Sequence, residues 1–206
     1  MGLIPDQRPR DWAYMATFDK KDLPFLEEMA RHIRETHDTA MIEDFNLKCE
    51  QKLTGQAAVL DNGIEIQSVT KTEDLVVNTG LQQCINIIIG TSSTRWSHFG
   101  IGADYTGVAV TNTALLSETL ATRVLLAWAE PIGMRMFFGA ISSQTEGFKP
   151  TSASEIGVYN GSAAGAVLLN RSGFRNPPTQ QFPGGFTEVV TAPIVVSAVI
   201  EFCPVA

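Results

Sequence analysis

Residues 96–107, WSHFGIGADYTG, separate two fold classes. A dinucleotide-binding loop of an α/β fold needs G-x-G-x-x-G after a strand and before a helix. Here Gly100 and Gly102 are followed three residues later by Tyr105, and the next segment, VAVTNT, has the composition of a strand. The Gly-Lys-Ser/Thr tripeptide that ends a P-loop is absent from the sequence. The stretch therefore indicates a β-strand in which two glycines allow bending or close packing.

The chain around this stretch, from residue 75 to the end, reads as short strands separated by turns. The segments LQQCINIIIGT, GMRMFFGAIS, SEIGVYNG, AGAVLLNRSGF and FTEVVTAPIVVSAVIEF are rich in β-branched and aromatic residues, and TRVLLAWAEP fits a helix or a strand. Several short strands with closely spaced turn signals are typical of a sandwich. The sequence thus predicts a mainly-β fold, an antiparallel β-sandwich of the jelly-roll or immunoglobulin-like type.

Residues 1–50 have a different character, because they are charged and helix-prone. Pro5 and Pro9 disfavour a helix over residues 1–21, which we expect to form an extended arm. Such an arm either packs on its own domain or docks on another subunit. The predicted division is a docking and assembly region at residues 1–50 and a β-sandwich domain at residues 51–206. The arm carries three large aromatic side chains without periodic partners: Trp12, Tyr14 and Phe18.

Residues 22–38 predict an amphipathic helix with Asp22 as its N-cap. The next segment, AMIEDFNLKCEQKL, either extends this helix or begins a second one. His32 and His37 are five residues apart, which is not the spacing of two metal ligands on one helical face. The arm and the helix together supply the predicted assembly surface, which consists of Trp12, Tyr14, Phe18, Phe25, Leu26, Met29 and Ile33.

Composition excludes several classes of function. The chain has 206 residues, enough for one medium domain with a sizeable core, and a net charge of −7. An acidic chain argues against a global non-specific binder of nucleic acid, because such binders must displace counterions from phosphate, and it leaves a local basic patch as the one route to such binding. The longest apolar runs are too short to span a bilayer. The three cysteines are widely spaced, so we expect reduced thiols. From the charge and the short apolar runs we expect no direct contact with nucleic acid and no membrane insertion.

No motif for catalysis or cofactor binding stands out. The sequence has no G-x-S-x-G, no H-E-x-x-H and no calcium loop of alternating Asp and Asn. Ser97 and His98 are neighbours in sequence, but adjacency does not create the geometry of a nucleophile and its base. The expectation is a non-enzymatic protein with no catalytic residue, no cofactor and no metal site.

The order of segments between residues 75 and 202, about two-thirds of the chain, resembles a family of small virion structural proteins of tailed phages and tailed archaeal viruses. The matching pieces are GIG at residues 100–102, TAL at 113–115 with Glu118, EIGVYN at 155–160 and LLNR at 168–171. No single piece is specific, and the order and spacing carry the resemblance. It implies a β-rich domain with a role in assembly.

The resemblance implies a homo-oligomer, a trimer or larger, in contact with itself and with other virion proteins. We expect a head decoration or turret protein, or another particle-surface component, anchored by its N-terminal region and assembled in the host cytoplasm. One alternative is a tail, neck, baseplate or fibre adaptor. Another is a module that binds a host-surface glycan or receptor through Trp96, Tyr105, Tyr159 or the loop RNPPTQQFPGG.

Four charged residues of the resembling region are candidates for structural ion pairs. Glu155 precedes a strand that reads as buried, and Arg171 lies in the next strand along the chain. A buried charge without a partner is costly, so buried members of this group should be paired. We expect Glu155 or Glu118 to contact Arg171 or Arg123.

Overall fold

The computed structural model describes residues 10–102, 104, 106–118, 123–142, 155–173 and 193–202. Its helices are the 3-10 turn η1 (Lys20–Asp22) and α1 (Leu23–Thr36), α2 (Thr39–Leu53) and α3 (Asn78–Ile88). Its strands are β1 (Arg10–Thr17), β2 (Ser68–Val76), β3 (His98–Gly102), β4 (Val124–Leu125), β5 (Trp128–Ile132), β6 (Arg135–Ser142), β7 (Glu155–Tyr159), β8 (Leu168–Gly173) and β9 (Ile194–Glu201).

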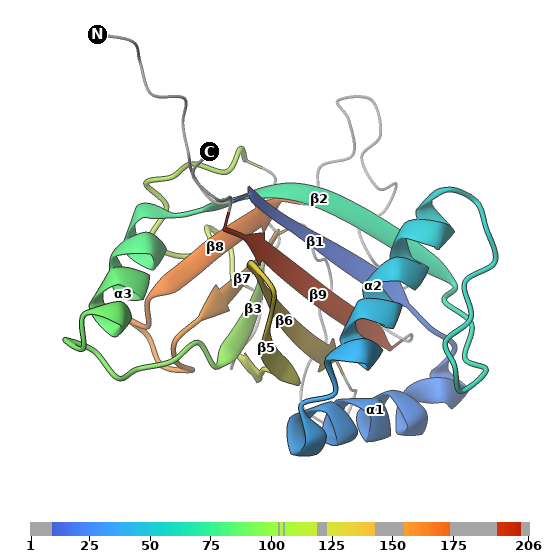
Figure 1. Ribbon diagram of the computed structural model, residues 1–206. Helices are drawn as coiled ribbons and strands as arrows, with labels where there is room; N and C mark the ends of the chain where they lie inside the picture. The colour runs from blue at the N-terminus through green and yellow to red at the C-terminus, as the bar shows by residue number, and fades with distance from the viewer. Residues whose placement is uncertain are drawn as a thin grey trace, which may run out of the picture.

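The strands pair antiparallel in the order β4-β3-β7-β8-β2-β1-β9-β6-β5 (Figure 1). The two end strands, β4 and β5, are joined by only Leu126 and Ala127. The Leu126 amide donates to the carbonyl of Ser97, and the Ala127 amide donates to the carbonyl of Gly139, at 2.9 and 2.7 Å. This short segment bonds beside β3 and to β6, so the two ends of the strand order lie side by side, although among the described residues β4 and β5 do not pair with each other. We call this curled sheet the barrel.

The prediction of a mainly-β antiparallel fold is confirmed. The finer choice between a jelly-roll and an immunoglobulin-like sandwich is not. β2 pairs with β1 on one side and β8 on the other, so it belongs to both halves of the fold. The two halves nevertheless enclose one apolar interior, which includes Met15 of β1, Phe99 of β3 and Val196 of β9.

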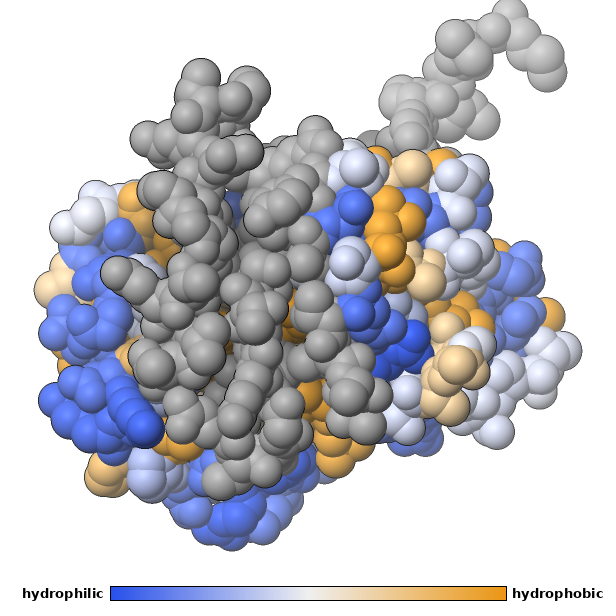
Figure 2. All heavy atoms as spheres, turned by 180° about the vertical axis from the view of Figure 1, so that it is seen from behind, coloured by the Kyte–Doolittle hydropathy of each residue, from blue (hydrophilic) through white to orange (hydrophobic). Residues whose placement is uncertain are grey.

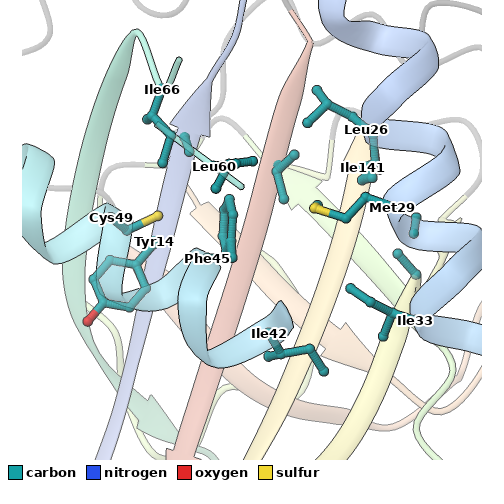
Figure 3. Packing of buried hydrophobic residues seen from close by; sticks show 14 of the residues in the cluster. Tyr14, Leu26, Met29, Ile33, Ile42, Phe45, Cys49, Leu60, Ile66 and Ile141 are labelled. Carbon is teal, nitrogen blue, oxygen red and sulfur yellow. The ribbon is translucent and has the colours of Figure 1, made fainter. Parts of the chain in front are cut away.

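A second apolar core lies outside the barrel, where α1 and α2 cover β1, β9 and β6 (Figure 3). Phe45 of α2 lies against Phe18 and against the ring of Trp128. The strands beneath these helices are therefore buried on both faces. In β9, for example, Val196 faces the interior while Val195 faces the helices.

Of the two alternatives for the predicted extended arm, packing on its own domain holds for Arg10–Thr17, which form β1 in the middle of the sheet, and docking on another subunit does not. Met15 is opposite Thr70 of β2 and Val196 of β9. The sequence does not show this segment as a strand because burial on both faces removes the polar alternation by which a half-buried strand is recognised. The boundary at residue 50 accordingly does not separate two packing units, and a deletion of residues 1–21 would remove a central strand.

The predicted assembly surface is also corrected. Five of its side chains, those of Tyr14, Phe18, Leu26, Met29 and Ile33, are buried in the core under the helices (Figure 3 labels four of them). Trp12 is half-buried beside that core. Only Phe25 is largely exposed, at 58%. These aromatic and aliphatic residues found their partners inside the same chain, so they are not available to another subunit.

The first helix ends earlier than a single long helix would. His37 adopts the left-handed conformation, with φ 54°, and caps α1. Asp38 then caps α2, because its side chain accepts from the amide of Met41 at 3.2 Å. The segment AMIEDFNLKCEQKL is therefore part of a second helix. Nδ1 of His37 also lies 2.6 Å from Oε1 of Glu130 in β5, and this contact ties the bend between the two helices to the sheet.

The segment LQQCINIIIGT, predicted as a strand, lies mostly in α3. Its β-branched composition favours a strand, but short apolar runs do not distinguish buried strands from helices. Packing decides the outcome here. Gly80 brings the first turn of α3 against the backbone of Leu169 in β8, so close that a Cβ at Gly80 would lie 2.7 Å from the Leu169 Cα. α3 lies on the other side of the molecule from α1 and α2 (Figure 1).

A polar network at the edge of the apolar core under α1 and α2 makes stability depend on pH. The hydroxyl of buried Tyr14 donates to Glu50, which also accepts from Lys71 at 2.6 Å. Burial, followed by the hydrogen bond and the charge of Glu50, raises the pKa of Tyr14 above its ordinary value of 10.0. The folded state therefore retains a proton that the unfolded chain loses above about pH 10.

Below about pH 10 we expect the ionisation of Tyr14 to have no effect on the free energy of unfolding. Above about pH 10 it should lower that free energy by up to about 1.4 kcal/mol per pH unit. Urea unfolding between pH 8 and 11 measures this slope. Above pH 10, the free energy of unfolding of the Tyr14→Phe variant should fall less steeply with pH than that of the wild type. Equal slopes for both proteins would mean that Tyr14 ionises as readily in the folded chain as in the unfolded one.

Candidate interaction surface

The glycines of the stretch HFGIG serve close packing on the outer face of β3. A Cβ at Gly100 would lie 2.8 Å from Oε1 of Glu118, and one at Gly102 would lie 2.7 Å from the carbonyl oxygen of Ser117. Gly157 of β7 lies opposite Gly100 and is equally enclosed. Because these glycines have no side chain, residues 115–118 can cross the sheet in close contact with its backbone. This agrees with the prediction that the glycines allow close packing.

The structure brings Glu155 and Arg171 together beneath this crossing segment. Nε of Arg171 donates to Oε2 of Glu155 at 2.6 Å, and both side chains are fully buried. The carboxylate also accepts from the amides of Leu116 and Ser117, at 3.2 and 2.8 Å. The buried glutamate therefore ties the crossing segment to the sheet while its charge is balanced by arginine.

The remaining guanidinium donors of Arg171 are also used. NH1 donates to the carbonyl of Gly107 and to Asn112, and NH2 donates to Asp104 and to the carbonyl of Thr106, at 3.2–3.3 Å. All five N–H groups of the guanidinium thus have acceptors. A fully satisfied cation leaves no donor for a substrate, so the arrangement is structural.

The second predicted pair also forms. Arg123 donates through Nε and NH2 to the two carboxylate oxygens of Glu118, at 2.8 and 3.1 Å. Its guanidinium carbon lies 3.5 Å from the ring centroid of Tyr159, and the Tyr159 hydroxyl accepts from the amide of Leu115 at 2.9 Å. This group holds both ends of the crossing segment.

Ser97 and His98 are in contact, with Oγ 2.8 Å from Nδ1. Desolvation, and then the positive charge of Arg123, lower the pKa of His98. Within the described residues His98 has no carboxylate partner that would orient the ring and stabilise an imidazolium. A cation beside the imidazole opposes its protonation, which is the reverse of what a general base needs. The pair therefore lacks the arrangement of an activated nucleophile.

The residues proposed for glycan or receptor binding do not form one exposed site. Tyr159 is fully buried, and Trp96 is half-buried against the barrel interior. Tyr105 and the loop RNPPTQQFPGG, residues 175–185, lie outside the described residues. Sugar binding uses an exposed aromatic side chain as a platform. Neither Trp96 nor Tyr159, the two residues of this set that the structure describes, offers one.

The two most exposed large apolar side chains among the described residues, those of Ile88 and Ile89, lie at the end of α3, and exposed Ile85 lies one turn before them. Ile88 is 82% exposed, Ile89, at the C-cap, 63% and Ile85 49%. Positions 85, 88 and 89 are spaced i, i+3 and i+4, so they share one face of the helix. Viewed from behind, hydrophobic atoms reach the surface among hydrophilic ones on the side of the molecule where α3 lies (Figure 2). We call these three residues the α3 face.

An apolar cavity of about 440 Å³ lies between α3 and the end of the barrel. One cationic side chain, that of exposed Arg95, stands among its lining residues. The lining residues come from α3, from the segment after it and from four strands and the residue that follows β9: Cys84, Ile87, Ile88, Arg95, Trp96, Ala129, Met136, Phe138, Leu169, Ile200 and Phe202. The α3 face and this cavity together form the candidate interaction surface.

Sequence reasoning missed this surface because it assigned residues 81–91 to a strand. The run INIII was the available signal, since four isoleucines in five residues exceed what one buried helical stripe requires. Once the segment is a helix, at least one of them must face outward.

Comparison with protein-family models, with curated proteins and with solved structures found no match to this chain. Among the described residues, no group of three or more His, Cys, Asp or Glu side chains is placed to hold a metal ion. In the same part of the chain, none of the helices combines the length and the apolar character needed to cross a membrane.

Proposed function

We propose that this protein is a non-enzymatic structural subunit of a virion, that it forms homo-oligomers, and that the α3 face is its principal contact with other subunits. The observation that carries the proposal is the exposure of Ile85, Ile88 and Ile89 on one helical face. The virion setting comes from the resemblance of residues 75–202 to small virion structural proteins.

Exposed apolar side chains in a group are costly to leave in water, and such groups usually mark contacts between proteins. Single exposed apolar residues elsewhere, such as Leu47 and Phe25, are ordinary. What distinguishes the α3 face is the spacing of its members and the apolar cavity beside it. The proposed anchor is therefore α3, in place of the N-terminal region, whose large side chains are mostly buried.

A position on the particle surface, as a head decoration or turret protein, is favoured by the compact length and by the absence of a fibre-like repeat in the sequence. A tail, neck or baseplate position uses the same contact and differs in copy number. The partners are further copies of this chain and other virion proteins.

Introducing a carboxylate into the α3 face should abolish assembly. We expect Ile88→Asp to remain folded, because the side chain is solvent-exposed, and to sediment as a monomer, because an interface that buries it must desolvate an unpaired charge. Sedimentation velocity of the wild type and the variant over a range of concentrations measures this effect.

Leu47→Asp is the matched control. Leu47 is an exposed aliphatic residue of α2, at 55%, outside the candidate surface. It should assemble like the wild type. The proposal is contradicted if Ile88→Asp and Leu47→Asp have the same oligomeric state as the wild type.

A further inference from the structure

We propose that the cavity between α3 and the barrel is a binding site for an amphiphile that has a flexible apolar chain and a carboxylate head group, such as a fatty acid. The inference goes beyond the assembly role and does not rest on it. The apolar lining, the connection to the barrel interior and the single cation at Arg95 carry it.

The walls of the cavity suit an acyl chain. Phe138, Leu169 and Ile200 belong to the apolar interior of the barrel, and Cys84, Trp96 and Met136 pack against that interior from its end. Side chains of the apolar interior therefore form part of the cavity wall. Cavities of a few hundred Å³ lined by apolar residues are typical ligand sites.

Arg95 selects the head group. Its side chain is exposed, and within the described residues it has no ion pair or hydrogen bond. Three arginines in or next to the strands differ from Arg95, because Arg123, Arg135 and Arg171 each pair with a carboxylate. An unpaired guanidinium at the rim of an apolar cavity favours a carboxylate, which it can bind through two parallel hydrogen bonds.

Cys84 provides a probe at the site itself. Its half-buried thiol lines the cavity, whereas Cys49 is fully buried on the inner face of α2. In a Cys203→Ser background, a small thiol reagent should modify Cys84 before Cys49. An acyl chain bound in the cavity covers Cys84, so the rate at which the reagent modifies Cys84 reports how much of the cavity is occupied, without any assay of function.

The experiment titrates the Cys203→Ser protein with dodecanoate below its micelle concentration. We expect saturable one-to-one binding by calorimetry and protection of Cys84 with the same midpoint. Dodecyltrimethylammonium, with the same chain and the opposite charge, should bind at least tenfold more weakly. Arg95→Glu should lose about tenfold in affinity for dodecanoate and reverse the preference, because a hydrogen bond to a charged group contributes that much or more. Arg95 is exposed, so the variant should fold.

Ala129→Phe, which places a ring in the cavity, should abolish both binding and protection. The proposal is overturned if dodecanoate leaves the rate of Cys84 modification unchanged, or if Arg95→Glu binds it as well as the parent does. It is also overturned if Cys84 is unreactive without ligand and becomes reactive on dilution of an oligomer, because a second copy of the chain then occupies the cavity. That last result would still support the assembly role, and the first two would leave it untouched.

Discussion

Arg171→Leu should lower the free energy of unfolding by about 3–5 kcal/mol, since it leaves a buried charge without its partner. Glu155 is fully buried, and Arg171 is its only cationic contact among the described residues. The substitution also removes the donors that hold Asp104 and the carbonyls of Thr106 and Gly107. For a chain of this length the loss corresponds to a fall in melting temperature of roughly 6–20 °C.

Differential scanning calorimetry measures this change, and α1 offers a matched control. Arg31 contacts Glu28 and Glu35, so it also bonds two carboxylates, but all three side chains are exposed. Water and salt screen such contacts, so Arg31→Leu should leave the melting temperature nearly unchanged. Equal small shifts for Arg31→Leu and Arg171→Leu would show that the Glu155–Arg171 pair is not buried as described.

Gly80→Ala should destabilise the protein, although alanine is the better helix former. In an exposed helix this substitution stabilises by up to about 1 kcal/mol. Here the new Cβ would meet the backbone of Leu169, including its Cα at 2.7 Å, and backbone atoms cannot swing aside as the end of a flexible side chain can. Such overpacking costs about 1–3 kcal/mol or more, and α3 would have to lift from the sheet.

Urea unfolding of Gly80→Ala should therefore give a lower midpoint than the wild type. Gly161→Ala is the control, since a Cβ there would make only an ordinary contact, 3.6 Å from the Cβ of Ala166. Its stability should lie within about 0.5 kcal/mol of the wild type. A Gly80→Ala protein as stable as the Gly161→Ala protein would mean that α3 does not rest on β8 in this way.

The sequence predicted the features that depend on local composition or on charge. The glycines of β3 signalled close packing because the next segment lacks the helix that a phosphate loop needs. The charges of Glu155 and Arg171, in neighbouring segments that read as strands, pointed to a buried pair because neither charge is tolerated alone. Both inferences rest on costs that a single residue imposes wherever its segment is placed.

The features that depend on tertiary contacts were not predictable. β1 reads as an arm because Trp12 and Tyr14 face the helices while Ala13 and Met15 face the interior, so no polar alternation remains. α3 reads as a strand because its isoleucines favour one, whereas in the fold the segment is a helix that packs through Gly80 against β8. The candidate surface depends on that helix, so it was not visible in the sequence.

Cryo-electron microscopy of the particle that contains this chain, with its copies counted and each α3 face examined, tests the assembly role most directly. The account predicts repeated copies, in which Ile85, Ile88 and Ile89 are covered by a neighbouring subunit. Copies that follow an icosahedral lattice would place the protein on the head, and a small ring would place it at the neck or tail. Absence of the chain from every particle, or an α3 face open to solvent in all copies, would contradict the account.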